Sequence, residues 1–320
     1  MSEKVEYSPK MGTLFELVAE LTDLSHIMSV LGWDQQVLMP SGGAEERGMQ
    51  LAALGKIMHE KFATDEVGQL IAELEAEVGD LYAETDEARS VKVSKKTYEK
   101  QAKVPLPLLM ENIQATTMAY EAWVKAKSTS DFSIFQPHLE KIVDLRKQYA
   151  DLFKLYDHIY DPLLDDFEPG MKTADVKEIF ETLRPQQVAL LQEIAEKEPP
   201  DNAFIKQHYK EEYQEIFGRY VITRFGYDWD RGRLDVAPHP FTTEFGLGDV
   251  RITTRYLKED AGSALFGTMH EAGHAMYGQG VPDKYKRHPL GGAASLAIHE
   301  SQSRLWENII GRSKEFWSFF

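Results

Sequence analysis

The spacing of apolar side chains along the first 220 residues constrains the fold most strongly. Between Thr13 and Leu31, apolar residues recur three and four positions apart, which is the period of an amphipathic α-helix. Similar segments follow, separated by turns rich in Pro, Gly, Ser and Asp. The predicted helices are residues 13–31, 45–62, 65–87, 106–126, 135–158, 173–198 and 203–225. We therefore expect a mainly α-helical protein, and no fixed-period repeat indicates a solenoid.

Two regions interrupt this helical pattern. Residues 33–43, with the sequence WDQQVLMPSGG, contain a Pro and paired Gly, so we predict a loop there. After Tyr227, Gly and Pro become frequent, and β-branched residues alternate along residues 251–256 as in a short strand. Together with residues 234–236 and 241–243, this segment predicts a small antiparallel sheet inside a helical protein.

Composition excludes several classes of protein. With 320 residues and 42% hydrophobic residues, the chain can bury a large core, and we expect residues 1–320 to form one domain. A net charge of −16, with basic and acidic residues interspersed, argues against nucleic acid as the main partner. The N-terminal sequence has no signal-peptide pattern, and no apolar stretch approaches the ~20 residues of a membrane span. The expected location is the cytoplasm.

The chain contains no cysteine, so any transition-metal site must use His, Asp and Glu. The sequence HEAGH occupies positions 270–274 within an apolar stretch that predicts a buried helix. On a helix, His270 and His274 lie on one face and can bind one cation, while Glu271 points beside it. Two core histidines without a metal are the alternative, but burying them with Glu271 without partners would be costly. The pattern predicts a metal site of the zincin type.

A catalytic zinc needs a third protein ligand and an open position. Tyr277 and Gly280 stand where metzincins have Gly and His, which excludes that class. The remaining candidates downstream are His288, His299, Glu300 and Glu307. We favour Glu300, because residues 301–303 surround it with small polar side chains that could form hydrogen bonds with a ligand carboxylate. In the alternative interpretation, Glu300 forms an ion pair with Arg304, one helical turn further on.

Three further motifs accompany residues 270–274, namely His239-Pro240-Phe241, Asp249-Val250-Arg251-Ile252-Thr253 and His299-Glu300-Ser301-Gln302-Ser303. Together, these motifs resemble the carboxypeptidase Taq family of metallocarboxypeptidases. Residues 33–35 and 39–43 are similar to the N-terminal region of that family, so the resemblance covers essentially the whole chain. Two further family motifs would lie beyond Phe320, and we expect the chain to be truncated at its C-terminal end.

The resemblance implies a fold, an activity and a cofactor. The fold would be a large helical, neurolysin-like zincin with a deep groove and a small sheet near the active site. The activity would be hydrolysis of the C-terminal peptide bond of peptides with a free carboxylate, with broad specificity. It also implies a homodimer and one divalent metal ion, zinc above all, with cobalt or manganese also possible.

Chemistry assigns each candidate residue a role. His270, His274 and Glu300 would hold the metal, and Glu271 would act as the general base. Recognition of a free carboxylate favours a guanidinium, and Arg251 is the candidate for it.

Each substrate-binding candidate also has a structural alternative. Arg251 could instead pair with Asp249 or Glu244. His239, between two prolines, could hydrogen-bond substrate or stabilise a turn. Asp249 could orient a metal-bound imidazole.

Two other functions are compatible with the sequence. One is an oligopeptidase or dipeptidyl enzyme with a similar helical groove. The other is a metal-binding chain without catalysis, because residues 314–320 contain four aromatic side chains that could leave apolar surface for a partner.

Overall fold

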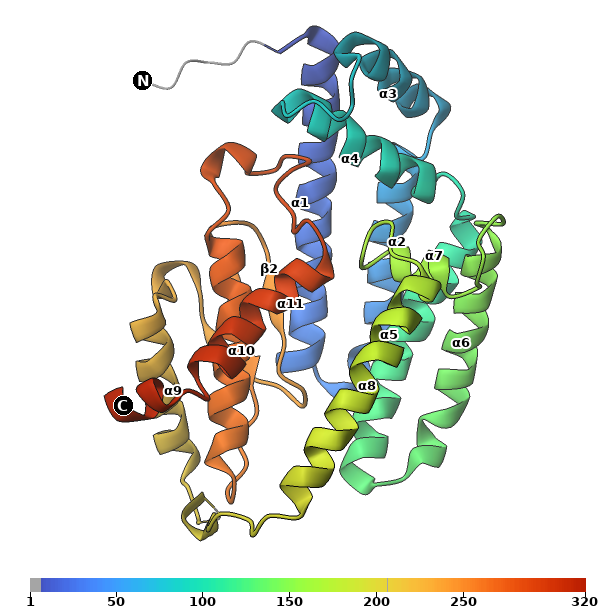
Figure 1. The fold of residues 1–320 in the computed structure, drawn as a ribbon. Helices are drawn as coiled ribbons and strands as arrows, with labels where there is room; N and C mark the ends of the chain where they lie inside the picture. The colour runs from blue at the N-terminus through green and yellow to red at the C-terminus, as the bar shows by residue number, and fades with distance from the viewer. Residues whose placement is uncertain (1–6, 206) are drawn as a thin grey trace.

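Helices make up most of the chain, as the apolar spacing predicted (Figure 1). The computed structural model describes residues 7–205 and 207–320. The α-helices are α1 (Pro9–Val37), α2 (Ala44–Phe62), α3 (Asp65–Val78), α4 (Asp86–Gln101), α5 (Leu106–Thr129), α6 (Gln136–Asp151), α7 (Asp161–Asp165), α8 (Thr173–Ala195), α9 (Glu211–Phe225), α10 (Ala261–Gln279), α11 (Leu296–Arg304) and α12 (Lys314–Phe319). A π-helix, η6 (Leu305–Ile310), follows α11 directly.

The first predicted loop is wrong for half of its length. Helix α1 continues through Val37, so Trp33 lies on a helix and is buried. Tertiary contacts stabilise this extra turn, because Gln35 Nε2 donates to the Thr117 carbonyl at 3.1 Å and Asp34 forms an ion pair with Arg47 at 2.7 Å. Helix α1 ends at Val37, shortly before Pro40, because a proline disfavours helical conformation in the residue that precedes it.

Other helix boundaries also differ from the prediction. The segment 65–87 divides at Gly79, whose φ of +72° favours glycine and ends α3. Helix α4 then begins after Thr85, whose side chain accepts a hydrogen bond from the Ala88 N–H. The helix predicted for 203–225 starts only at Glu211, and the one predicted for 135–158 ends at Asp151.

The predicted sheet has three strands in the order β1-β3-β2. Strand β2 (Thr242–Glu244) pairs antiparallel with β3 (Val250–Thr254), as predicted. Strand β1 (Leu234–Val236) pairs parallel with β3, so the sheet is mixed. The chain reverses direction twice between β1 and β3, which gives these two strands the same direction.

Helix α10 lies between the sheet and other helices. Its Ala272 and Ala275 pack against Val250 and Ile252 of β3, together with Ile222 of α9. Helix α11 crosses α10 on another face. The helix that carries the HEAGH sequence is therefore held by a sheet and by two neighbouring helices (Figure 1).

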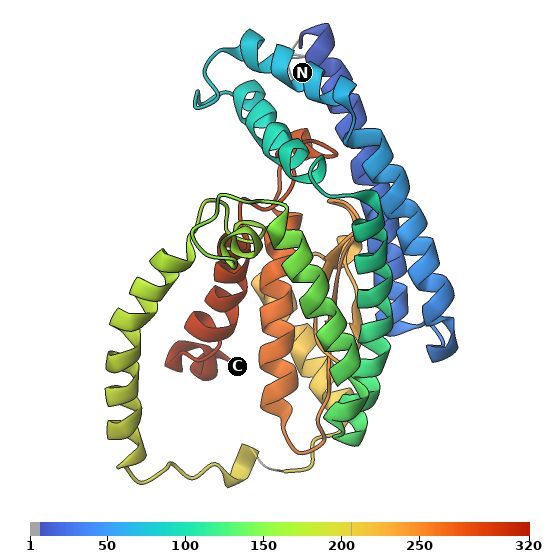
Figure 2. The same cartoon turned by 90° about the vertical axis from the view of Figure 1, so that its right-hand side faces the viewer.

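Helix α8 stands apart from the helices around α10 (Figure 2). Among the residues that the structure describes, it buries no side chain. Its exposed large apolar residues are Ile179, Phe180, Leu183, Val188, Leu190, Leu191 and Ile194. None of the helices in the described part of the chain combines the length and the apolar character that a membrane crossing requires.

The aromatic residues of 314–320 do not all remain exposed. Phe316 is buried against Val221, Leu265 and Met269. Trp317 and Phe319 are exposed. The predicted apolar surface is therefore partly present.

Candidate metal centre

Helix α10 places His270 and His274 on one face, with ring centroids 4.9 Å apart. Asp260 caps this helix by accepting a hydrogen bond from the Ser263 N–H at 3.1 Å. Buried residues such as Met269 occupy other faces of the helix. Core packing therefore fixes the direction in which the two imidazoles point.

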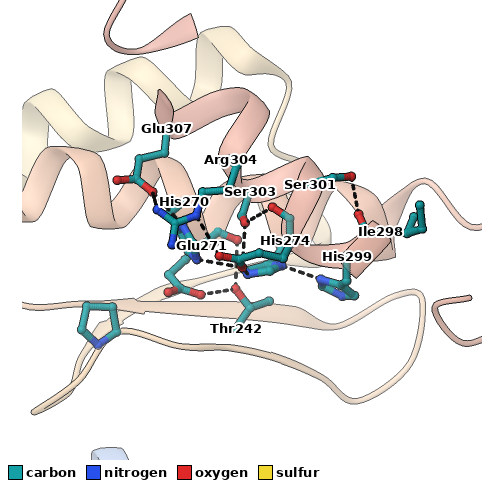
Figure 3. A network of polar contacts seen from close by, with 12 residues as sticks. Thr242, His270, Glu271, His274, Ile298, His299, Ser301, Ser303, Arg304 and Glu307 are labelled. Atoms are coloured by element: carbon teal, nitrogen blue, oxygen red, sulfur yellow. Dashed lines mark hydrogen bonds and ion pairs between the residues drawn. The ribbon is translucent and has the colours of Figure 1, made fainter. Parts of the chain in front are cut away.

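Helix α11 brings Glu300 to the imidazoles of His270 and His274; Figure 3 labels these two histidines. Glu300 Oε2 lies 3.5 Å from His270 Nε2 and 3.2 Å from His274 Nε2, and one ligand atom from each residue lies within 4.8 Å of the others. Ligands ~2.0–2.1 Å from a tetrahedral metal are about 3.3 Å apart. Two imidazole nitrogens and a carboxylate oxygen at this spacing fit one divalent transition metal.

The other candidates for the third ligand have different positions. Glu307 Oε2 lies 2.9 Å from His270 Nδ1, on the ring atom opposite the metal-facing nitrogen. His299 Nδ1 contacts His274 Nδ1. His288 packs against Phe15, with ring centroids 4.5 Å apart and the rings tilted. Among the described residues, only His270, His274 and Glu300 form a group suited to a metal.

Glu307 and His299 are thus outer partners of the two imidazoles, and the sequence analysis did not assign them this role. It raised Asp249 as a possible partner of an imidazole, whereas in the structure both Asp249 oxygens accept hydrogen bonds from Arg251 at 2.8 Å. One sequence signal was present for Glu307, since it lies seven positions after Glu300 and thus two helical turns away on the same face.

The π-helix η6 carries Glu307, and arginines hold its carboxylate in place. Arg304 Nη1 lies 3.2 Å from Glu307 Oε2, and Arg312 Nη2 lies 3.1 Å from Oε1. π-Helical turns often occur at functional sites. With Nδ1 of His270 donating to this carboxylate, Nε2 is left as the lone-pair donor that a metal requires.

Glu300 itself has two hydrogen-bond donors. Ser303 Oγ lies 3.0 Å from Oε2, and Arg304 Nε donates to Oε1 at 2.8 Å. Ser301 instead donates to the Ile298 carbonyl, so only part of the expected polar surrounding is formed. Burial acts to raise the pKa of Glu300, but the hydrogen bonds from Arg304 and Ser303 outweigh it and lower the pKa. The carboxylate is therefore ionised at neutral pH.

Burial also keeps the imidazole of His274 neutral. It lowers the pKa of His274 to about 4, with neighbouring His299 and His270 adding to the effect. A neutral imidazole is the form that binds metal.

Glu271 projects from α10 toward strand β2 (Figure 3). Only 6% of the residue is exposed, and the Thr242 hydroxyl donates to Oε2 at 2.7 Å. Burial raises the pKa of the Glu271 carboxyl, although the hydrogen bond from Thr242 opposes the shift. A raised pKa makes the carboxylate a better proton acceptor near neutral pH.

Gly273 allows α10 and α11 to approach closely. A Cβ at this position would lie 2.7 Å from both the Gln302 carbonyl oxygen and Ser303 Cα, which are backbone atoms. We expect Gly273→Ala to destabilise the fold by about 1–3 kcal/mol, because the helix carrying Glu300 must move. Gly267→Ala is the control, since its Cβ meets only Pro240 at 3.7 Å. Urea denaturation of both variants measures the effect, and equal stabilities would show that the crossing tolerates a methyl group.

The two predicted substrate-binding residues lie outside the metal group. Arg251 uses Nε and Nη2 for Asp249, and its guanidinium lies 4.7 Å from the ring centroid of Trp33. The ion pair with Asp249, which was the structural alternative to carboxylate binding by Arg251, is therefore present. His239 is exposed, and its Nδ1 lies 2.6 Å from the Pro240 carbonyl oxygen. Their contacts with substrate stay predictions.

Residues 13–320 match the model of the carboxypeptidase Taq (M32) metallopeptidase family. The chain belongs to this family. The resemblance seen in the sequence motifs is thereby confirmed. A metallopeptidase family implies a divalent metal, which agrees with the group formed by His270, His274 and Glu300.

Relatives in this family cover nearly all of the chain. Carboxypeptidase 1 of Bacillus subtilis is 36% identical over 305 residues, which are 95% of this chain and 60% of that protein. Thermostable carboxypeptidase 1 of Pyrococcus furiosus is 40% identical over 296 residues, which are 92% of this chain and 59% of that protein. The chain thus spans about 60% of the length of these relatives.

Solved structures of M32 carboxypeptidases confirm the helical fold. The crystal structure of BsuCP superposes with a TM-score of 0.93 at 35% identity, covering 96% of this chain and 62% of that one. The M32 carboxypeptidase of Deinococcus radiodurans gives a TM-score of 0.84 at 38% identity, covering 97% of this chain and 62% of that one.

Proposed function

We propose that the chain acts as a metal-dependent carboxypeptidase that hydrolyses the C-terminal peptide bond of peptides with broad specificity. The observation that carries this proposal is the cluster of His270, His274 and Glu300. The carboxylate of Glu271 lies beside the two imidazoles (Figure 3). The carboxypeptidase names of the M32 relatives support it.

Zinc is the proposed metal, with cobalt or manganese as alternatives. Two neutral imidazoles and one carboxylate suit zinc, which commonly has three protein ligands in catalytic sites. A cation bound there supplies Lewis-acid chemistry that activates water and polarises a carbonyl.

Glu271 is the proposed general base. Its buried carboxylate would accept a proton from the attacking water and then pass it to the leaving amine. The hydrogen bond from Thr242 holds this carboxylate on the side of α10 that faces β2. The raised pKa caused by burial suits a group that accepts and later releases a proton.

Arg251 and His239 remain the proposed contacts for the substrate carboxylate and backbone. In Arg251 the Nη1 group makes no contact with Asp249, whereas Nε and Nη2 do. If Arg251 binds the carboxylate, Arg251→Ala raises KM for free-carboxylate peptides more than for amidated ones. Equal losses on both peptides would assign Arg251 to the ion pair with Asp249.

We further propose that residues 1–320 belong to one catalytic domain, and that the protein is a cytoplasmic homodimer. The packing of α10 against both the sheet and neighbouring helices supports a single domain. Sedimentation analysis and cell fractionation test the oligomeric state and the location.

Mass spectrometry of peptide ladders tests the reaction class. The zinc-loaded chain should remove residues stepwise from the C-terminus of a free peptide, leave the matching C-terminally amidated peptide uncut, and stop when a chelator is added. Cleavage of both peptides at similar rates would favour an oligopeptidase. A chain that binds zinc but cleaves neither peptide would favour a non-catalytic metal-binding role.

A further inference from the structure

The imidazole of His299 and the carboxylate of Glu244 lie on the side of His274 that faces away from the proposed metal. His274 Nδ1 contacts His299 Nδ1, and His299 Nε2 lies 3.7 Å from Glu244 Oε1. The three residues come from α10, α11 and β2 respectively. His274, His299 and Glu244 form a row that leads away from Nε2 of His274. Figure 3 shows the contact between the two histidines.

The protons in this row can be assigned by elimination. In a His274 ring that offers the Nε2 lone pair to a metal, the proton of the neutral imidazole would be on Nδ1. That proton needs an acceptor, and the contacting atom is Nδ1 of His299, which must then be unprotonated. The neutral His299 ring therefore carries its proton on Nε2, the nitrogen that faces the Glu244 carboxylate.

We propose that Glu244 is a positioning residue of the metal centre. Its negative charge favours the His299 tautomer protonated on Nε2, and this tautomer in turn accepts the Nδ1 proton of His274. Glu244 thereby holds His274 in the form that offers Nε2 to a metal, without contacting the metal itself. The inference rests on the proposed metal site.

The local structure keeps the Glu244 carboxylate in place. Thr242 and Glu244 are two positions apart on β2, so both side chains point to the face where α10 lies. At Gly278 of α10, a Cβ would lie 2.8 Å from Glu244 Cδ, so the absence of a side chain leaves room for the carboxylate. Tyr277 packs its ring edge to face with His299, with centroids 5.1 Å apart.

Different carboxylates act on the imidazoles of His270 and His274. Glu307 contacts His270 directly at 2.9 Å, whereas Glu244 acts on His274 through an intervening ring. A carboxylate in direct contact has the stronger effect on the ligand ring. Loss of the Glu307 charge is therefore expected to weaken metal binding more than loss of the Glu244 charge.

Zinc affinity tests the proposal without relying on catalysis. Competition with a chromophoric chelator at fixed pH would give the zinc Kd of each variant. Glu244→Gln removes the charge with little change in shape, and Gly278→Ala displaces the carboxylate. We expect both to raise the zinc Kd by about 10–100-fold, as loss of an outer partner does. Glu212→Gln, at an exposed position of α9, and Gly267→Ala on α10 are the matched controls.

Nitrogen NMR of the histidine rings supplies a readout that a purely structural role would not move. In the metal-free parent chain, neutral His299 should carry its proton on Nε2, and Glu244→Gln should shift it toward a mixture of tautomers. An unchanged zinc Kd in Glu244→Gln, or an Nδ1-protonated His299 in the parent, would overturn the inference. Failure of the parent to bind zinc would instead overturn the metal site, while the tautomer spectrum would still decide the role of Glu244.

Discussion

Glu271→Gln is expected to lower kcat by about 10²–10⁴-fold, the usual contribution of a positioned general base. The amide has nearly the same shape and can still accept a hydrogen bond from Thr242, but it cannot take a proton from water. Glu271 is also not part of the group of metal-binding atoms, so zinc content should stay at about one ion per chain. Steady-state hydrolysis of a free-carboxylate peptide and elemental analysis of the same sample measure the two effects.

Glu212→Gln makes the same chemical change on an exposed position of α9 and should leave kcat unchanged. Near-parental activity in Glu271→Gln would show that another group accepts the proton. A loss of activity accompanied by a loss of zinc would place Glu271 in metal binding instead.

His274→Ala is expected to abolish stable zinc binding. The substitution removes one of the three proposed protein ligands and also the contact between His274 Nδ1 and His299 Nδ1. The zinc Kd should therefore rise by more than the ~10–100-fold that loss of an outer partner causes. Hydrolysis should fall in parallel, because both the metal and its geometry are lost.

Equilibrium dialysis against buffered zinc measures this effect, with His208→Ala as the control at an exposed position. Circular dichroism of both variants checks that the helical fold is retained. Stoichiometric zinc in His274→Ala at the concentration that saturates the parent would exclude His274 as a ligand.

The candidate ligands could be located from the sequence because the spacing of the two histidines is local. His270 and His274 are one helical turn apart, and a single helix fixes their relation before any tertiary contact forms. Glu300 followed from the polar residues after it and from the resemblance to the family. The structure now places it 3.2 Å from His274 Nε2.

The outer partners could not be predicted in the same way. Glu307 lies on the π-helix η6 and contacts His270, and the spacing of apolar residues does not specify that winding. The row from His274 through His299 to Glu244 depends on the packing of three elements that are distant in sequence. Asp249, which the sequence offered as a possible partner of an imidazole, instead forms an ion pair with Arg251 two residues further on.

The fold shows the same division between local and tertiary effects. Helix spacing predicted most helices of the chain, but the end of α1 depends on contacts of Asp34 and Gln35 with other helices. Helix α3 ends at Gly79, which has a positive φ. A single glycine among charged helix-forming residues does not predict that conformation. Strand positions followed from β-branched residues, whereas the parallel pairing of β1 with β3 depends on how the intervening chain turns.

Anomalous diffraction at the zinc edge, from crystals grown with zinc, tests the central claim most directly. The account predicts one strong peak per chain, with His270 Nε2 and His274 Nε2 at ~2.0–2.1 Å and a Glu300 oxygen at ~2.0–2.2 Å. Glu307 and His299 should remain on the far side of the two imidazoles. A peak bound by other residues, or zinc held by Glu307 in place of Glu300, would contradict the account.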